Sequence, residues 1–280
     1  MRICEETKTR VKTALLLGIG AAVILFFSDR PLVARLAALG LSAFGVAEIL
    51  MGMRVSPKWL RILLVFFAEG FALAVFFWKS PWSLPAAALV FGIGLLAFGV
   101  PEVGLARQKR IPRAAVCPFA FLIPVLYSAT YQLSLLPQGR AMLCAVVLTC
   151  TVNDIAAYFI GRRFGRHRLS PHVSPHKTVE GALGGLCCAV GGGLLLLWIA
   201  CLIFGWRANF PLAAALFACI ALTGQFGDLA TSSLKRILGL KDFGRLFPGH
   251  GGILDRFDSQ LFAAPAAVLF SLLFGSIFLG

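Results

Sequence analysis

Four polar residues share one face of an otherwise apolar stretch at residues 224–242, GQFGDLATSSLKRILGLKD. In a helix, Ser232 lies one turn after Asp228, and Lys235 and Arg236 lie one turn further on. Mg²⁺ is typically bound by one or two carboxylates together with substrate phosphates. Lys and Arg then balance the remaining phosphate charge. The spacing therefore indicates a site for a metal ion and a phosphorylated substrate.

A second polar segment, FPGHGGILDRFDS at residues 247–259, follows this stripe. Gly251 and Gly252 have no side chains, so their backbone N–H groups can approach an anion. Asp255 and Asp258 project to the same side if a helix starts near Ile253. Taken alone, the segment is also explained by a flexible glycine turn with chance charges. Its position downstream of the Asp228 stripe favours a site.

A third segment, LSPHVSPHKTVEGALGG at residues 169–185, ends in the predicted start of a helix. Ser174 or Thr178 could serve as its N-cap, with Glu180 in the first turn. A helix N-terminus with Lys177 beside it suits an anion. Ordinary capping at a membrane surface explains the same pattern equally well.

The chain that must position these residues is strongly apolar. Of its 280 residues 59% are hydrophobic and 14% are charged, and the mean hydropathy is +0.88. Continuous apolar runs long enough to span a bilayer recur along it, so we predict an all-α, polytopic integral membrane protein. The runs do not alternate as the strands of a β-barrel would. The net charge of +14 lies in short loops, which indicates membrane topology and no nucleic-acid partner.

Nine transmembrane helices are predicted, with bounds good to a few residues. They cover residues 12–28, 31–53, 59–78, 83–105, 113–135, 139–161, 178–205, 210–236 and 258–279. We expect residues 1–135 to form about five N-terminal transmembrane helices. Residues 136–280 then form a catalytic region with two long loops, at 162–177 and 237–257.

The basic residues orient this arrangement. Twenty-one of the 26 Lys and Arg residues fall in the N-terminal tail and the even-numbered loops, and only four fall in the odd-numbered loops. The positive-inside rule then places the N-terminus in the cytoplasm and the C-terminus outside. Both long loops become cytoplasmic, and we expect function to concentrate in them and in the flanking helices.

Three further acids lie in or near the predicted spans of the first half. An intramembrane acid is a functional candidate, because burying its charge is costly. Glu48 and Glu102 lie near cytoplasmic ends, where they could simply reach water. Glu69 lies deeper and has no motif around it.

Residues 232–258 closely resemble the signature of the phosphatidate cytidylyltransferases, which are also called CDP-diacylglycerol synthases. The matching positions are Ser232, Lys235, Arg236, Lys241, Asp242, His250, Gly251, Gly252, Asp255, Arg256 and Asp258. Residues 156–181 are similar to a second motif region of that family. The first half of the chain matches only as apolar spans.

The resemblance implies that CTP and phosphatidic acid react to give CDP-diacylglycerol and pyrophosphate. In the family, aspartates matching Asp228 and Asp255 hold the catalytic metal, one or two Mg²⁺ ions. We assign the following roles as hypotheses. Lys235, Arg236 and Lys241 neutralise the triphosphate; Ser174, Lys177 and Thr178 engage phosphate near the lipid head group; Ser232, His250, Gly251, Gly252 and Arg256 contact substrate; Asp242 and Asp258 order the loop.

Some positions differ from the residues that are most common in the family. Thr231 stands where many members have Glu, and Phe243 where many have Ser. The loss of an acid at 231 puts the details of metal or nucleotide contact in doubt. A CTP-dependent polyprenol or lipid kinase is the nearest chemical alternative. A transporter is an alternative from another class, although its polar sites usually lie in broken helices near the midplane.

The resemblance also implies a location. We expect the chain in a bacterial inner membrane, with its active site facing the cytoplasm. The sequence leaves the oligomeric state open, a homodimer included.

Overall fold

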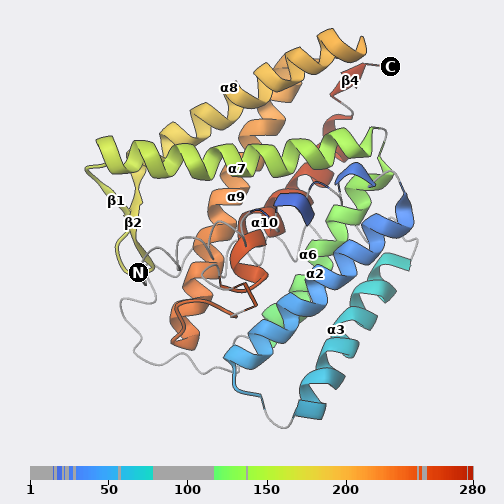
Figure 1. Cartoon of the computed structure of the whole chain (residues 1–280), viewed down its shortest axis with the longest axis vertical. Helices are drawn as coiled ribbons and strands as arrows, with labels where there is room; N and C mark the ends of the chain where they lie inside the picture. Colours follow the sequence, from blue (N-terminus) through green and yellow to red (C-terminus); the bar gives the residue numbers. More distant parts are fainter. Residues whose placement is uncertain are drawn as a thin grey trace.

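Long helices make up most of the structure (Figure 1). The computed structural model describes residues 30–55, 58–77, 117–136, 138–244, 246–247, 251–275 and 277–279, with positions 15, 18–20, 22 and 25–27. The helices are α2 (Pro31–Gly52), α3 (Lys58–Phe77), α6 (Cys117–Leu135), α7 (Gly139–Phe164), α8 (Val179–Phe204), α9 (Phe210–Leu238) and α10 (Leu254–Phe274). The predicted all-α class is confirmed for this part of the chain.

Two short antiparallel strand pairs join the helices. β1 (Arg168–Ser170) and β2 (Ser174–Thr178) form a hairpin between α7 and α8, where the sequence predicted a loop. β3 (Arg207–Ala208) pairs with β4 (Phe278–Leu279) and ties the start of α9 to the end of the chain. The hairpin lies at one end of α7 and the β3–β4 pair at the other (Figure 1).

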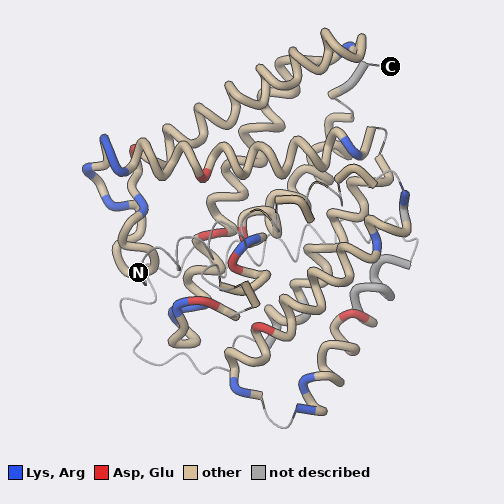
Figure 2. The backbone as a smooth tube through the Cα atoms, viewed as in Figure 1, with Lys and Arg blue, Asp and Glu red and all other residues tan. Residues whose placement is uncertain are grey.

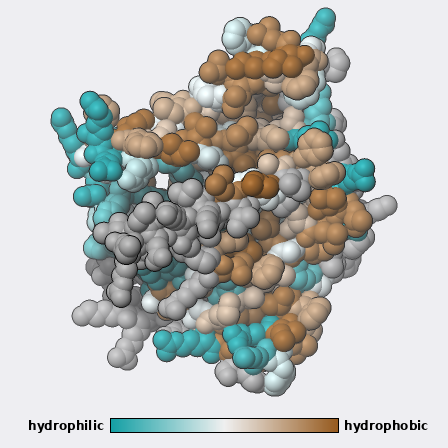
Figure 3. All heavy atoms as spheres, viewed as in Figure 1, coloured by the Kyte–Doolittle hydropathy of each residue, from teal (hydrophilic) through white to brown (hydrophobic). Residues whose placement is uncertain are grey.

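Five of the described helices are long and apolar enough to cross a membrane: α2 (from Leu32), α7, α8, α9 and α10. Large apolar side chains are exposed on them, such as Phe204 and Leu202 of α8. Figure 3 shows hydrophobic residues over much of one face, with hydrophilic residues gathered toward its left and lower edges. This is the architecture of an integral membrane protein. The predicted span 83–105 lies outside the described residues and span 12–28 is described only in part, so the number nine stays a prediction.

One predicted boundary is wrong in a way that matters for the site. The sequence placed a loop through residue 257, but α10 begins at Leu254 with Ile253 as its N-cap. Asp255 and Arg256 therefore lie in the first turn of a helix. The more local expectation, that a helix starts near Ile253, is confirmed.

α9 and α10 occupy the centre of the packing. Leu234 of α9 and Phe262 of α10 lie in one buried apolar cluster with Ile49 of α2 and Ile123 of α6. A second cluster joins other parts of α9 and α10 to α6 and α7. The N-terminal helices thus share a core with the two helices that carry most of the predicted site.

α7 and α8 approach closely through small residues. A Cβ atom at Gly181 would lie 2.7 Å from the backbone oxygen of Ala157, and one at Gly185 would lie 2.8 Å from that of Asn153. Small residues four positions apart allow two membrane helices to pack with their backbones nearly in contact. This contact fixes the start of α8, and with it the end of the hairpin.

Substitution of Gly185 by Ala should lower the melting temperature of the detergent-solubilised protein, because the added methyl group overpacks the α7–α8 contact. Such overpacking costs about 1–3 kcal/mol. Gly191→Ala is the matched control on the same helix, since a Cβ there meets nothing within 4 Å. Its melting temperature should stay constant or rise, because Ala favours a helix over Gly. Equal melting of the two variants would contradict the proposed close contact.

Candidate active site

A cavity of about 830 Å³ opens between α7, α8, α9, the hairpin and the start of α10. Its lining carboxylates are Asp154, Asp228, Asp242, Asp255 and Asp258, and its lining cations are Arg162, Arg166, Arg168, Lys177, Lys235 and Arg256. Figure 2 shows basic residues clustered at the hairpin and acidic residues toward the middle of the molecule. A cavity with both charges suits a phosphorylated ligand bound together with a metal ion.

Two of these carboxylates, Asp228 and Asp255, form salt bridges, and Asp255 is the more deeply buried. Its side chain is 2% exposed, and Oδ1 lies 2.9 Å from Nζ of Lys235. Oδ2 accepts hydrogen bonds from the backbone N–H groups of Phe243 (2.8 Å) and Gly252 (2.9 Å). Gly251 has φ +81, and a Cβ there would lie 2.7 Å from Oδ2. One carboxylate therefore joins α9, α10 and both ends of the segment between them.

Asp228 joins α9 to the hairpin. Lys177 of β2 forms a salt bridge with its Oδ2, and both side chains are about a quarter exposed, at 28% and 26%. Ser232 Oγ donates to Oδ1 at 3.4 Å, so the predicted one-turn spacing brings these two side chains together. The predicted helical stripe is confirmed as a geometry for Asp228, Ser232 and Lys235.

Asp154 was not among the predicted site residues, although it lines the cavity. Its carboxylate accepts from Asn153 Nδ2 (3.2 Å) and from Ser259 Oγ of α10 (3.3 Å). Asp228 and Asp258 line the same cavity as Asp154. The sequence did carry a signal, since Asp154 is an acid within a membrane span.

The donor set fits Mg²⁺ in its usual form of binding. Among the described residues, no group of three or more His, Cys, Asp and Glu side chains could hold an ion alone. Asp228 and the other carboxylates of the lining could instead supply one or two hard oxygen ligands, with water and substrate phosphates as the rest. Lys177 and Lys235 neutralise Asp228 and Asp255 in the structure as it stands.

Arg236 makes contacts other than those that the sequence suggested. Its Nε donates to the backbone oxygen of Val173 in the hairpin (3.1 Å), and Nη1 donates to that of Leu240 (3.3 Å). Arg236 is absent from the cavity lining. It braces the hairpin against the end of α9, and its predicted contact with phosphate stays a prediction.

The other predicted binding residues differ in where they lie. Thr178 lines the cavity, but its Oγ1 accepts from Gly181 N (3.1 Å) as the N-cap of α8. Ser174 and Lys241 lie outside the lining, and Lys241 is exposed. The N–H of Gly252 binds the protein's own carboxylate at Asp255. His250 lies outside the described residues.

Two polar braces near the cavity escaped the sequence reasoning. Gln225 Nε2 of α9 donates to Asn153 Oδ1 of α7 (2.7 Å) and to the backbone oxygen of Ala182 of α8 (2.9 Å). Glu180 accepts from the backbone N–H groups of Arg166 and His167 and contacts His167 Nδ1 at 2.6 Å. The first brace holds three helices at one point, and the second closes the base of the hairpin.

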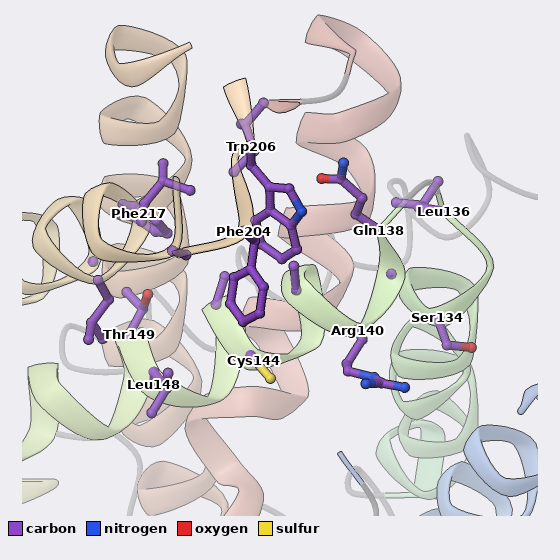
Figure 4. A pocket seen from close by; sticks show the side chains of 18 residues that line it. Ser134, Leu136, Gln138, Arg140, Cys144, Leu148, Thr149, Phe204, Trp206 and Phe217 are labelled. Carbon is purple, nitrogen blue, oxygen red and sulfur yellow. The ribbon is translucent and has the colours of Figure 1, made fainter. Parts of the chain in front are cut away.

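A second cavity, of about 710 Å³, lies toward the β3–β4 end of the helices. Figure 4 shows Phe204 and Trp206 projecting into it between Phe217 and Arg140. Arg140 is the only charged residue in its described lining. No Asp or Glu is found in the described lining of this cavity, so the first cavity is the candidate active site.

Comparison with known proteins adds a family to this geometry. The model of the "Cytidylyltransferase family" matches residues 8–274. A phosphatidate cytidylyltransferase of Brucella suis is 40% identical over 201 residues, which cover 72% of this chain and 60% of the relative. A phosphatidate cytidylyltransferase of Staphylococcus haemolyticus is 44% identical over 128 residues, which cover 46% of this chain and 48% of the relative. The chain thus spans about half of the length of one of these curated relatives and 60% of the other.

Replacement of Arg236 by Met should loosen the hairpin, because the hydrogen bond to the backbone oxygen of Val173 is lost. Such a bond is worth about 0.5–1.5 kcal/mol, so amide hydrogen exchange across residues 168–178 should become several-fold faster. Lys241→Met removes an exposed cation nearby and serves as the control. Unchanged exchange in the Arg236 variant would show that the hairpin is held by other contacts.

Proposed function

Because the chain belongs to the cytidylyltransferase family, we propose that it transfers the cytidylyl group of CTP to phosphatidic acid, forming CDP-diacylglycerol and pyrophosphate. The observation that carries this proposal is the convergence of carboxylates, Lys and Arg from three helices and the hairpin in one cavity. That composition matches the phosphate groups of both substrates and a metal ion between them.

The reaction exchanges one phosphorus–oxygen bond for another. An oxygen of the phosphatidate phosphate attacks the α-phosphorus of CTP, and the bond from that phosphorus to the pyrophosphate oxygen breaks. Negative charge grows on the departing pyrophosphate, so catalysis depends mainly on positioning and charge neutralisation. Lys235 and Arg256 supply positive charge beside Asp255, where we place the triphosphate of CTP.

The hairpin side of the cavity suits the lipid phosphate. Arg162, Arg166, Arg168 and Lys177 line it together, and Arg162 Nη1 also donates to Tyr158 Oη at 3.2 Å. Tyr158, at 59%, is exposed on α7, as expected for an aromatic residue at the membrane interface. We therefore place the phosphatidate head group between α7 and the hairpin.

Asp228 and Asp255 are the proposed ligands of one or two Mg²⁺ ions. When bound, Mg²⁺ neutralises phosphate oxygens and so favours the attack on the α-phosphorus. Asp154 and Asp258 line the same cavity as Asp228, so their carboxyl oxygens are further candidate ligands. If Asp228 held a metal ion, Lys177 could pair with a substrate phosphate in place of Asp228.

The membrane arrangement follows from the distribution of charge. We propose nine spans with a cytoplasmic N-terminus and an external C-terminus in a bacterial inner membrane, which places the cavity on the side where CTP is found. We also propose that residues 136–280 form the catalytic region, since every described residue that lines the cavity lies between 153 and 258.

Purified protein in detergent, supplied with phosphatidic acid, Mg²⁺ and CTP labelled at the α-phosphate, should form a labelled lipid. Asp228→Asn should reduce this turnover by at least roughly 100-fold, because a preorganised charge in the site is lost. Asp255→Asn should do the same. Glu69→Gln is the control, because Glu69 lies on α3, away from the cavity, and the amide can still accept from Ser42 Oγ.

The position of the label separates the alternatives. A CTP-dependent lipid kinase would transfer label from the γ-phosphate, and a transporter would label no lipid from either position. Transfer of the γ-label, or no transfer by folded wild-type protein, would overturn the proposed function. Near-normal activity of Asp228→Asn would remove that residue from the proposed metal ligands.

Removal of divalent ions with EDTA should abolish lipid labelling, and added Mg²⁺ should restore it. The physical reason is that the described Lys and Arg residues of the cavity balance only part of the negative charge of a bound triphosphate. A metal ion held by Asp228 and Asp255 would balance more of it. Ca²⁺ at the same concentration should restore less activity, since it prefers a larger coordination shell. Full activity in EDTA would contradict the assignment of a metal.

A further inference from the structure

A carboxylate from the N-terminal half of the chain is buried against the start of α10. Glu48 lies on α2 and is 3% exposed. Its Oε1 accepts from the backbone N–H of Ile253 (2.8 Å), and its Oε2 accepts from that of Leu254 (2.9 Å). The sequence suggested that Glu48 could simply reach water, and the burial shows that this reading is wrong.

These two hydrogen bonds cap α10 from outside its own sequence. The first N–H groups of a helix have no partner within the helix, and the N-cap residue Ile253 makes no side-chain hydrogen bond to them. A negative charge at this end of a helix is also favoured by the helix dipole. Glu48 therefore supplies the acceptor oxygens that a Ser, Thr or Asp side chain usually supplies at the N-cap position.

Glycines on both sides of the carboxylate make this approach possible. A Cβ atom at Gly244 or at Gly252 would overlap the carboxylate oxygens of Glu48. Gly244 follows Phe243, whose N–H binds Asp255, and Gly252 itself binds Asp255. The slot that receives Glu48 is thus built from the same backbone that holds the proposed metal ligand.

Two carboxylates divide the backbone donors of this turn. The N–H of Gly252 binds Asp255, and the next two N–H groups bind Glu48. The start of α10 is held from one side by α2 and from the other by Lys235 of α9, through Asp255. A shift of the Glu48 contact would move the backbone of Asp255, which lies one residue beyond Leu254.

We propose that Glu48 is a positioning residue for the reaction, which acts through the first turn of α10 to hold Asp255 at the cavity. It touches neither cavity nor substrate, since it is absent from the lining. The proposal rests on the proposed function, in which Asp255 binds Mg²⁺. It gives the N-terminal helices, none of whose described residues lines the first cavity, an indirect part in catalysis.

The test compares Glu48→Gln with Glu69→Gln in detergent. The amide at position 48 keeps one acceptor but turns an NH₂ group toward a backbone N–H. Loss of a partner behind a metal ligand typically costs roughly 10–100-fold in metal affinity or activity. The Mg²⁺ concentration for half-maximal activity should therefore rise about tenfold in Glu48→Gln, while the KM for phosphatidic acid stays within about twofold. Glu69→Gln should change neither.

A purely structural role would give a different result. Partial unfolding lowers the amount of active protein, but the folded fraction keeps the wild-type Mg²⁺ requirement. An unchanged Mg²⁺ requirement in Glu48→Gln would therefore overturn the proposal. If Glu48→Gln does not fold, Glu48→Asp replaces it, because the shorter carboxylate keeps the charge and lengthens the two hydrogen bonds.

Two further measurements test the same contact, and the second does not depend on the reaction. Gly244→Ala should reproduce the altered Mg²⁺ requirement, and it should be less harmful when combined with Glu48→Ala, which removes the overlapping group. Hydrogen exchange across residues 252–257 should be faster in Glu48→Gln than in wild type. If wild-type protein made no CDP-diacylglycerol, the proposed function would fail, and unchanged exchange would then still reject the role of Glu48.

Discussion

The structure depends on the burial of one charged group, the carboxylate of Asp255. A carboxylate that is removed from water must be paired and hydrogen-bonded, because the cost of an uncompensated buried charge is several kcal/mol. Lys235 and two backbone N–H groups provide this compensation. The partners come from α9, from the segment after it and from the turn before α10, so that the charge can be accommodated only when all three are in place. The need to compensate the charge of Asp255 thus fixes the conformation of the described residues between α9 and α10.

The same constraint recurs across the cavity with different partners. Asp228 is paired with Lys177, which fixes the hairpin against α9, and Glu180 collects the N–H groups at the base of that hairpin. Asp228 and Asp255 therefore each have a Lys partner in the absence of substrate. Such paired carboxylates can exchange a protein cation for a metal ion without leaving an unpaired charge.

Membrane packing explains how so polar a region remains in an apolar chain. Small residues let α7 and α8 meet with their backbones in near contact, while α9 and α10 are enclosed by apolar side chains of α2, α6 and α7. The polar groups face inward to the cavity or out at the hairpin end, and the large apolar side chains face outward. Burial of Glu48 at the start of α10 ties the N-terminal helices into this arrangement.

The sequence by itself determined the features that are local. Apolar runs require membrane helices, the spacing of Asp228, Ser232 and Lys235 places them on one helical face, and the resemblance at 232–258 gave the family. Tertiary structure alone decided which backbone groups these side chains meet. It brought Asp154 and Asp228 into one cavity, turned Arg236 to the hairpin, and brought Glu48 to Ile253 across about two hundred residues. The physical reason is that a buried polar group takes whichever partner the packing brings within hydrogen-bonding distance, and packing between distant helices leaves no periodic signal along the chain.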